Sequence, residues 1–351
     1  MNGILSPVRI AVIGCGYWGP NLIRNFSFAQ EFSLVAACDL DSERLDFVKR
    51  QFSIEKVTTD ARAIIEDPSI EAVAISTPVS THAALARDAL LSGKHVLVEK
   101  PLANSARECE ELARIAERTG RVLLVDHTFL YTGTVEKIRD LIDRGELGRL
   151  YYFDSVRVNL GLFQHDCNVL WDLAPHDLSI MLYLIEERPF EIIAVGATPV
   201  DPTSHSYESV AYLMARFRSG LIAHVHVNWL APVKIRLTMI GGSRKMVVWD
   251  DVEPDTKLRI YDRGVDAAPT AEAIYRTLVQ YRTGDMYAPK IEKAEALRKE
   301  CLHFADCIRN DATPRSDAKF GRDVVVILEA AQKSLQRGGA VVRLHFAEDH
   351  E

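Results

Sequence analysis

The sequence has no Cys-x-x-Cys pair, no long apolar run and no basic block. Its six cysteines are scattered over 351 residues, which argues against a disulfide framework or a zinc ribbon and predicts buried thiols. No segment approaches 18 uninterrupted apolar residues, so we expect no membrane-spanning helix. Lysine and arginine number 42 against 49 acidic residues, a net charge of -7. That balance argues against a nucleic-acid or anionic-membrane partner.

The first residues, MNGILSPVRIAVIG, lack the basic start, apolar stretch and cleavage site of a secretory signal. We therefore expect a cytoplasmic protein. Hydrophobic residues make up 48% and charged residues 26%, which is typical of a soluble globular protein. The length is too great for one typical core and predicts two domains.

Short apolar runs alternate with helical patterns from Val8 to about Val125. The runs are RIAVIG, LVAACD, AVAIST, HVLVEK and RVLLVD. Continuous apolar strands separated by helices indicate a parallel sheet covered on both faces. Residues 1–126 are therefore predicted to form an α/β domain with a doubly wound, Rossmann-type sheet.

The pattern changes after Asp126, and residues 127–351 are predicted to form an α+β domain. Helices are expected at about 134–144, 171–185, 291–309 and 319–336, and the last of these is long enough to pack back on the first domain. Two-residue alternation between them predicts a large open sheet, mostly antiparallel. Residues 264–290, rich in Ala, Thr and Gly, are predicted to form a mobile loop.

Two strands of this open sheet are predicted to have one polar and one apolar face. In FDSVRVNLGL, Ser155, Arg157 and Asn159 alternate with apolar residues. In LIAHVHVNWL, His224 and His226 do the same. The polar face is expected to carry the substrate, and the sheet is expected to form the interface of a homodimer or homotetramer.

A glycine loop lies between the first strand and the first helix, in VRIAVIGCGYWGPNLIRNF. Gly14, Gly16 and Gly19 form G-x-G-x-x-G, with Tyr17 and Trp18 between the last two glycines. Such a loop lets backbone amides approach a pyrophosphate at a helix N-terminus. The spacing predicts a dinucleotide site made by these five residues; a glycine turn without a cofactor is the alternative.

The second strand ends on Asp39, at the spacing of an acid that binds the adenosine ribose. A carboxylate there favours NAD over NADP, although Arg44 lies close enough in sequence to reach a 2′-phosphate. In STPVSTH, Thr77, Pro78 and His82 are predicted to line the cofactor at the carboxyl edge of the sheet. Alternatively, His82 belongs only to the first turn of the following helix.

In HVLVEKP, a buried strand runs into Glu99 and Lys100 at the same edge. Adjacent residues of a strand point to opposite faces, so the two are not expected to pair with each other. Burial of an ammonium is costly unless it is paired or used. Lys100 therefore points either at the nicotinamide end of the cofactor or back into the domain. We predict a functional role for it at this edge, with Glu99 and Lys100 in the cofactor site; a structural ion pair is the alternative.

The glycine loop, the STPxxxH segment, EKP and WDLAPHDL together resemble the Gfo/Idh/MocA family of oxidoreductases. The resemblance extends from about Val8 to the end of the last helix. It implies that Lys100 is catalytic and lies beside the substrate and the nicotinamide, and that Pro101 follows a cis peptide bond. It also implies an NAD-dependent enzyme that transfers a hydride between a sugar carbon and the nicotinamide.

NVLWDLAPHDLSIMLYL places Asp172 and His176 four residues apart, on one face of a regular helix. A neutral histidine can take a hydroxyl proton near neutral pH, and a carboxylate can orient it or bind a hydroxyl group. The family pattern carries an aspartate and a histidine at this spacing. This sequence departs from it at Ser179, where many members have another aspartate, and at Ala174-Pro175, where glycine is commoner.

This helix has two other interpretations. His165, Cys167, Asp172 and His176 are possible zinc ligands, but their spacing fits no standard site and a nearby lysine would repel the ion, so no metal is expected. In the second interpretation, His176 only packs as part of the helix and has no chemical role.

The substrate is predicted to bind polar residues of the second domain through hydrogen bonds. The predicted set is Arg157, Asn159, His165, Asp166 and Asn168. Two segments, GYWGPNLIRNF and FQHDCNVLWDLAPHDLSIM, resemble more weakly a nucleotide-sugar subgroup that oxidises the 3-hydroxyl of UDP-N-acetylhexosamines.

A nucleotide sugar would need donors for its diphosphate. The basic side chains available are Arg157, Arg236, Arg244 and Lys245. Without such a basic cluster, a free sugar or an inositol is the expected substrate. A non-catalytic, dinucleotide-sensing regulator with this fold is the third alternative, although it would not need Lys100, Asp172 and His176 together.

Overall fold

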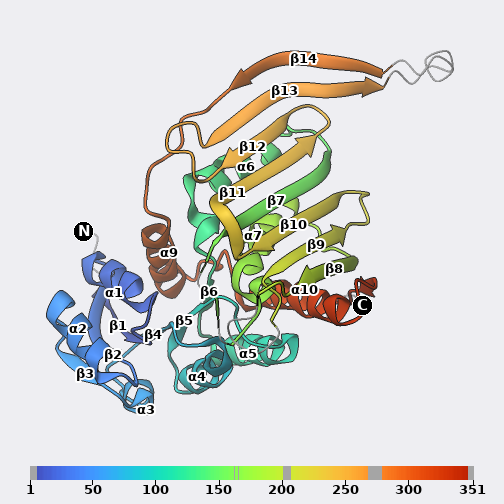
Figure 1. Ribbon diagram of the computed structural model, residues 1–351. Coiled ribbons are helices and arrows are strands. Elements are labelled where there is room, and N and C mark those ends of the chain that lie inside the picture. The colour runs from blue at the N-terminus through green and yellow to red at the C-terminus, as the bar shows by residue number, and fades with distance from the viewer. Residues whose placement is uncertain (1–5, 162, 165, 201–206, 268–278, 347–351) are drawn as a thin grey trace. The chain divides into compact units, whose positions relative to one another are not determined.

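The structure is a computed structural model that describes residues 6–161, 163–164, 166–200, 207–267 and 279–346 (Figure 1). The chain divides into two compact units. The first comprises residues 1–131 and 294–326, and the second comprises residues 132–293 and 327–351. Residues 294–326, which the sequence pattern assigned to the second domain, therefore belong to the first unit.

The first unit contains a six-stranded parallel sheet in the order β3-β2-β1-β4-β5-β6. Its strands are β1 (Val8–Ile13), β2 (Phe32–Cys38), β3 (Lys56–Thr58), β4 (Ala72–Ile75), β5 (His95–Glu99) and β6 (Leu123–Asp126). The predicted doubly wound sheet is confirmed. Only the three-residue β3 was not predicted, because it is too short to show a hydrophobic pattern.

Helices flank this sheet, and two come from the end of the chain (Figure 1). They are α1 (Gly19–Phe28), α2 (Ser42–Phe52), α3 (Ala61–Ile65), α4 (Val79–Leu91), α5 (Ala106–Thr119), the 3-10 turn η1 (Thr128–Tyr131), α9 (Ala296–Asn310) and the start of α10 (Ala318–Gln336). Helix α9 packs on α1 and on η1. The ring of Phe304 stacks on Phe32 at 6.1 Å, and Phe32 meets Phe26 edge-on at 4.9 Å. Helix α9 thus completes the core of the first unit.

The second unit contains, in the described part of the chain, a nine-stranded sheet in the order β14-β13-β12-β11-β7-β10-β9-β8-β15. Its strands are β7 (Leu150–Leu160), β8 (Glu191–Ala197), β9 (Val210–Arg216), β10 (Ile222–Asn228), β11 (Leu230–Gly242), β12 (Met246–Asp250), β13 (Leu258–Ala267), β14 (Val279–Tyr287) and β15 (Val342–Arg343). Strands β7 and β10 pair in parallel, and the other described pairs are antiparallel. The predicted open, mostly antiparallel sheet is confirmed.

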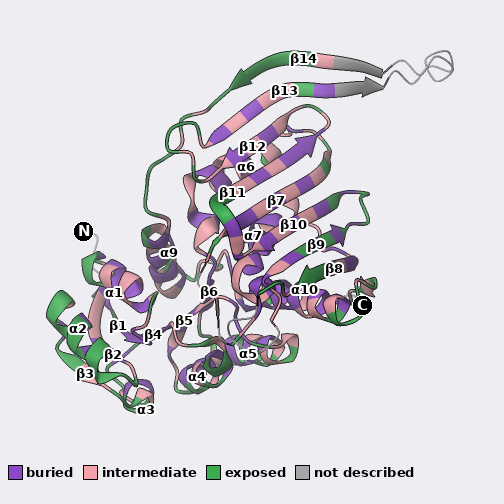
Figure 2. Ribbon diagram, viewed as in Figure 1, coloured by how far each residue is buried: buried purple, intermediate pink, exposed green. Residues whose placement is uncertain are grey.

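Helix α7 (Val169–Ile185) packs on β7, β9 and β10, and α6 (Gly133–Asp143) packs on α7. Burial alternates along the strands that α7 covers (Figure 2). Residues 264–267 and 279–287, which were predicted to belong to a mobile loop, instead form parts of β13 and β14. Residues 288–290 have no regular structure, and residues 268–278 lie outside the described part. No helix among the described residues is long and apolar enough to cross a membrane.

The predicted polar face of β7 is wrong for two of its three residues. Ser155 and Arg157 are 1% and 6% exposed and face α7. Strand β7 runs parallel to β10, and Ser155 lies beside Val225 in that register. The polar residues of β7 therefore share a face with the buried valines of β10. His224 and His226 lie on the opposite, open face as predicted.

Candidate active-site residues in the two units

The glycine loop after β1 is closely packed against the end of β4. Gly14 has φ of +99°, and a Cβ there would lie 2.5 Å from the carbonyl oxygen of Ser76. A Cβ on Gly19 would lie 2.2 Å from the carbonyl oxygen of Gly14, which also accepts a hydrogen bond from Ser76 Oγ at 2.8 Å. Gly16 is less crowded, because the nearest group to a Cβ there would be the Arg44 guanidinium at 3.5 Å. The loop has the tight, side-chain-free form that fits a pyrophosphate at the N-terminus of α1.

Asp39 follows β2 and is oriented by the backbone. Its Oδ2 accepts a hydrogen bond from the Cys15 amide at 2.6 Å, and its Oδ1 accepts one from the Asp41 amide at 2.9 Å. Arg44 lies close, with Nη1 3.9 Å from Asp39 Oδ2 and Nε 3.3 Å from Asp41 Oδ2. A carboxylate fixed in this way can accept ribose hydroxyl groups with its remaining lone pairs.

A pocket of about 350 Å³ lies beside this loop. Its lining residues are Cys15, Gly16, Tyr17, Pro20, Asp41, Glu43, Arg44 and Phe47. Tyr17 is 89% exposed at its rim. The pocket has the position expected for the adenosine half of a dinucleotide, next to Asp39 and the N-terminus of α1.

His82 on α4 is buried, and its ring bridges two loops at the edge of the sheet. Its Nδ1 lies 3.0 Å from the Pro101 carbonyl oxygen, and its Nε2 lies 2.8 Å from the Thr77 carbonyl oxygen. Burial lowers the pKa of His82, and a neutral ring donates to only one of the two carbonyl oxygens. The structure gives His82 a scaffolding position, while Thr77 and Pro78 form the loop that it holds.

Lys100 directly follows β5, and the Lys100–Pro101 peptide bond is cis, as the family resemblance implied. The Lys100 amide donates to Glu99 Oε2 at 3.1 Å. Glu99 lies beside Asp126 of β6 in the strand register. Asp126 is buried and accepts a hydrogen bond from Trp18 Nε1 at 3.1 Å. The glycine loop is therefore connected to the strand end that carries Glu99 and Lys100.

In the second unit, α7 presents the predicted acid and base. Asn168 caps the helix: its Oδ1 accepts from the Trp171 amide at 3.1 Å, and its Nδ2 donates to Glu208 and Gln332 at 2.7 and 2.9 Å. Asp172 Oδ2, one turn later, accepts from Trp229 Nε1 at 3.0 Å. Asp172 and His176 are both half-buried, four residues apart along the helix. Trp229, which follows β10, was not predicted as a site residue, because its place in the alternating pattern indicated only an apolar face.

The remaining predicted substrate residues have different environments. Asp166 is exposed and Asn159 is half-buried, whereas both N–H groups of the Asn168 amide already have partners inside the unit. His165 lies outside the described residues.

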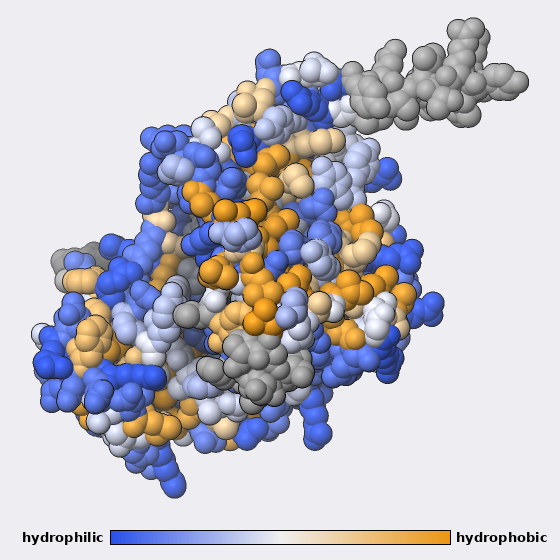
Figure 3. Space-filling view, viewed as in Figure 1, coloured by the Kyte–Doolittle hydropathy of each residue, from blue (hydrophilic) through white to orange (hydrophobic). Residues whose placement is uncertain are grey.

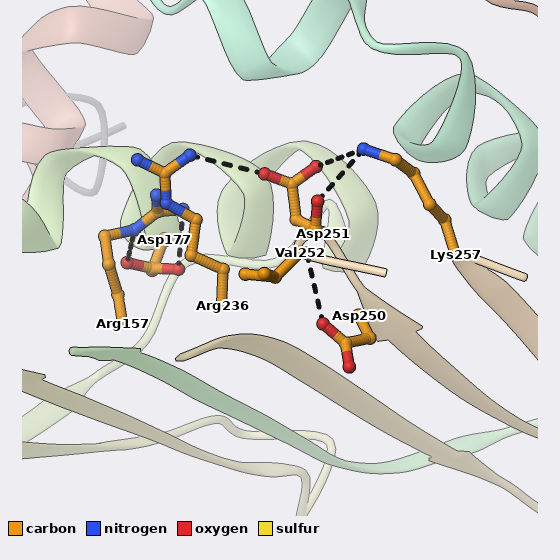
Figure 4. A network of polar contacts seen from close by, with 7 residues as sticks. All are labelled: Arg157, Asp177, Arg236, Asp250, Asp251, Val252 and Lys257. Atoms are coloured by element: carbon orange, nitrogen blue, oxygen red, sulfur yellow. Dashed lines mark hydrogen bonds and ion pairs between the residues drawn. The ribbon is translucent and has the colours of Figure 1, made fainter. Parts of the chain in front are cut away.

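Arg157 contacts Asp177 of α7 rather than an open surface (Figure 4). The distance from Arg157 Nε to Asp177 Oδ2 is 2.7 Å, and Ser155 Oγ donates to the same carboxylate at 2.6 Å. Beside it, Arg236 and Lys257 pair with Asp251 at 3.4 and 3.3 Å. Burial and the nearby charge of Arg157 lower the pKa of Arg236. The network neutralises buried charges inside the unit.

The sequence and the structure have relatives in one family of enzymes. Residues 8–127 match a family model described as an oxidoreductase family with an NAD-binding Rossmann fold, and residues 135–247 match the GFO/IDH/MocA C-terminal domain. The chain belongs to the Gfo/Idh/MocA family. It is therefore an oxidoreductase with an NAD-binding Rossmann domain.

Other family members resemble the chain over different lengths. The scyllo-inositol 2-dehydrogenase (NAD(+)) of Bacillus subtilis is 27% identical, with 88% of each chain covered. The dTDP-3,4-didehydro-2,6-dideoxy-alpha-D-glucose 3-reductase of Saccharopolyspora spinosa is 33% identical over 43% of this chain and 46% of its own. The solved UDP-N-acetylglucosamine 3-dehydrogenase of Acidithiobacillus ferrooxidans has a TM-score of 0.79 and 22% identity, over 94% of this chain and 98% of its own.

Proposed function

We propose that this oxidoreductase oxidises a secondary hydroxyl group of a cyclic polyhydroxylated molecule, a free sugar or an inositol. The observation that carries the proposal is the pair on α7: Asp172, fixed by Trp229, precedes His176 by one helical turn. An oriented carboxylate beside a half-buried imidazole is suited to bind a hydroxyl group and remove its proton. The resemblance to an inositol dehydrogenase over 88% of both chains supports the same substrate class.

Three side chains predicted from the sequence have roles in the proposed reaction. NAD, when bound, supplies the hydride acceptor. His176 takes the hydroxyl proton, and Asp172 holds the imidazole or a neighbouring hydroxyl group in place. The Lys100 ammonium stabilises the negative charge that develops on the substrate oxygen, which is the type of electrostatic stabilisation that contributes most to many enzymes.

An uncharged substrate is favoured because the basic residues suited to a diphosphate have internal partners. Arg157 pairs with Asp177, and Arg236 pairs with Asp251. Lys245 pairs with Glu146 at 2.8 Å, and Arg244 Nη1 donates to the Gly145 carbonyl oxygen at 3.2 Å. Recruitment of these cations for a diphosphate would leave carboxylates such as Asp177 buried without a counter-charge, which costs several kcal/mol.

A nucleotide sugar oxidised at C3, such as a UDP-N-acetylhexosamine, is the second candidate. It is supported by the resemblance of two sequence segments to that subgroup and by the 33% identity to a nucleotide-sugar 3-reductase. That match covers 43% of the chain, so the inositol-type substrate keeps the stronger support.

The test is the appearance of reduced-nicotinamide absorbance when the purified protein and NAD meet a substrate panel. The panel contains inositols, free hexoses and UDP-hexosamines, with 2-oxoglutarate added in a parallel set to reoxidise a tightly held cofactor. We expect turnover with an inositol or a free sugar, and none with the His176→Ala variant. Turnover confined to UDP-hexosamines would replace the first candidate by the second. No absorbance change with any substrate of the panel, together with intact NADH binding, would favour a non-catalytic sensing protein.

A further inference from the structure

Three carboxyl groups gather inside the first unit, where β5 and β6 end and α9 covers them. Glu99 and Asp126 are neighbours in the strand register, and Glu300 approaches from α9. Asp126 and Glu300 are 2% and 0% exposed, and the Oε1 atom of Glu99 is fully enclosed. A buried cluster of this kind cannot hold three negative charges unless cations or protons compensate them.

Hydrogen bonds reach only part of this cluster. Asp126 accepts from Trp18 Nε1 at 3.1 Å and from Thr128 Oγ1, while Glu99 Oε2 accepts from the Lys100 amide at 3.1 Å. Among the described residues, Glu99 Oε1 and both oxygens of Glu300 are buried without a hydrogen-bond partner. A carboxylate in that position would be desolvated without any compensating hydrogen bond, whereas a protonated carboxyl group can donate a hydrogen bond to Asp126.

Electrostatics favour protons on both glutamates. Burial, followed by the negative charge of Asp126, raises the pKa of Glu99 well above its usual value. The same two causes raise the pKa of Glu300, and the charge of Glu99 adds to them. Burial and the neighbouring negative charge thus favour the protonated form of both Glu99 and Glu300.

The other titratable and charged groups around the cluster do not supply an alternative counter-charge for Glu300. They are Lys100, His127, Tyr131, Cys301 and Arg315. Burial lowers the pKa of His127 to about 4 and raises the pKa of Cys301 and of Tyr131, so these three are neutral. The Lys100 ammonium acts on Glu99, and the Arg315 guanidinium lies over the Tyr131 ring at 4.5 Å.

We propose that Glu300 is a positioning residue for the glycine loop: protonated Glu300 and Glu99 donate hydrogen bonds to Asp126, and Asp126 in turn holds Trp18 and the glycine loop. Each oxygen of Asp126 already accepts one hydrogen bond and has a further lone pair available. Loss of a proton from the cluster places like charges side by side, and the repulsion displaces Asp126 from Trp18. Binding of NAD is therefore coupled to the protonation of a cluster that does not touch the reacting atoms.

The experiment follows the Kd of NADH by its fluorescence from about pH 6 to about pH 9, a range in which an unperturbed carboxyl group does not titrate. We expect binding to the wild-type protein to weaken toward alkaline pH, by up to about tenfold per pH unit once a required proton is lost. Glu300→Gln keeps a donor and removes one ionisation, so its Kd should change less over the same range. Glu117→Gln, an exposed substitution on α5, is the matched control and should follow the wild-type profile.

A second measurement, of thermal stability against pH, distinguishes a protonated Glu300 that donates a hydrogen bond from a Glu300 side chain that only fills space. A carboxyl group whose pKa is raised by folding contributes stability below its unfolded value, near 4.5, and that contribution is lost as pH rises toward the folded value. The melting temperature of Glu300→Gln, relative to that of the wild type, should therefore rise as the pH is raised above about 4.5. A difference that is constant with pH would show that Glu300 only fills space.

A third variant keeps the proposal testable if Glu300→Gln does not fold. Trp18→Phe removes the indole donor and disconnects the glycine loop from Asp126. It should bind NADH more weakly than the wild type at about pH 6 and lose the alkaline dependence. A wild-type Kd that is flat with pH, or a folded Glu300→Gln with the wild-type profile, would overturn the proposal. None of these measurements depends on the substrate, so they stand apart from the proposed function.

Discussion

Asp39 is positioned by two backbone amides and not by a cation. The amides of Cys15 and Asp41 each donate to one of its oxygens, and they fix the plane of the carboxylate at the carboxyl end of β2. Arg44 is 3.9 Å away and more than half exposed, so its side chain is free to turn while the aspartate stays in place. We therefore propose that the carboxylate binds the adenosine ribose and that the Arg44 side chain turns toward the 2′-phosphate when NADP binds.

We predict that Asp39→Ala weakens binding of NADH more than binding of NADPH. Loss of hydrogen bonds to a charged acceptor costs about 1.5–3 kcal/mol, or about 10- to 100-fold in Kd. NADPH should lose less, because removal of the carboxylate also removes its repulsion of the 2′-phosphate. Fluorescence titration with both dinucleotides measures the two effects. Equal losses would show that Asp39 does not contact the ribose.

Lys100 is the residue of the first unit with the strongest claim to a chemical role. We predict that Lys100→Ala lowers kcat by about 100- to 1,000-fold, the usual effect of removing one group that stabilises developing charge. The Kd of NADH should change little, since the glycine loop and Asp39 are untouched. Lys49→Ala, at an exposed position of α2, is the matched control. Unchanged turnover in Lys100→Ala would remove the lysine from the mechanism.

At the scale of single elements, α7 depends on its first residue. The Asn168 side chain caps the helix and uses its two amide N–H groups on Glu208 and Gln332. Asp172 and His176 follow in the next two turns, so an ordered N-terminus sets the direction in which both project. In this structure Asn168, which the sequence suggested as a substrate ligand, has its donors engaged within the unit.

We predict that Asn168→Ala lowers the free energy of unfolding by about 1–3 kcal/mol, through loss of the cap and exposure of buried partners. The KM of the best substrate should stay close to the wild-type value. Asn168→Ser is the control, because serine caps a helix nearly as well as asparagine and should recover the part due to capping. Chemical denaturation and steady-state kinetics give the two numbers. A raised KM with unchanged stability would return Asn168 to the substrate site.

The elements that the sequence predicted best are those whose pattern is local. The parallel strands of the first unit are continuous apolar runs, and the motifs at their carboxyl ends lie at one edge because parallel strands end there. The prediction of an open polar face on β7 failed because the direction of that face depends on the register with β10, a strand more than sixty residues later. Alternation gives the two faces of a strand but not which of them a helix will cover.

Glu300 was missed for a related reason. It lies on the buried stripe of α9 beside Leu297 and Phe304, where a single acid in an apolar pattern is the only sequence signal. Its meaning comes from Asp126, about 170 residues earlier, and from the return of α9 to the first unit. No local period indicates that a helix near the end of the chain completes the first domain.

At the scale of the whole molecule, the face of the second sheet opposite α7 is not covered by another helix of the second unit in the described part of the chain. Apolar side chains gather on that face (Figure 3). Val195, Tyr212, Met214 and Ile222 lie there and are between 39% and 49% exposed. The Tyr212 ring stacks on His226 at 4.3 Å and on His224 at 6.1 Å, which gives the middle of the face a flat aromatic surface. Extended apolar surfaces of this kind are typical of interfaces between proteins.

We predict that the chain is a homodimer or homotetramer and that Met214→Asp shifts it toward the single chain. A charge on an open strand position would be buried against the partner copy without compensation, which costs several kcal/mol and outweighs the contribution of the methionine. Leu91→Asp, on the exposed side of α4 in the first unit, is the matched control and should keep the wild-type mass. Light scattering after gel filtration measures the mass of each variant. A single-chain mass for the wild-type protein would contradict the prediction, and an oligomer that survives Met214→Asp would place the interface on another surface.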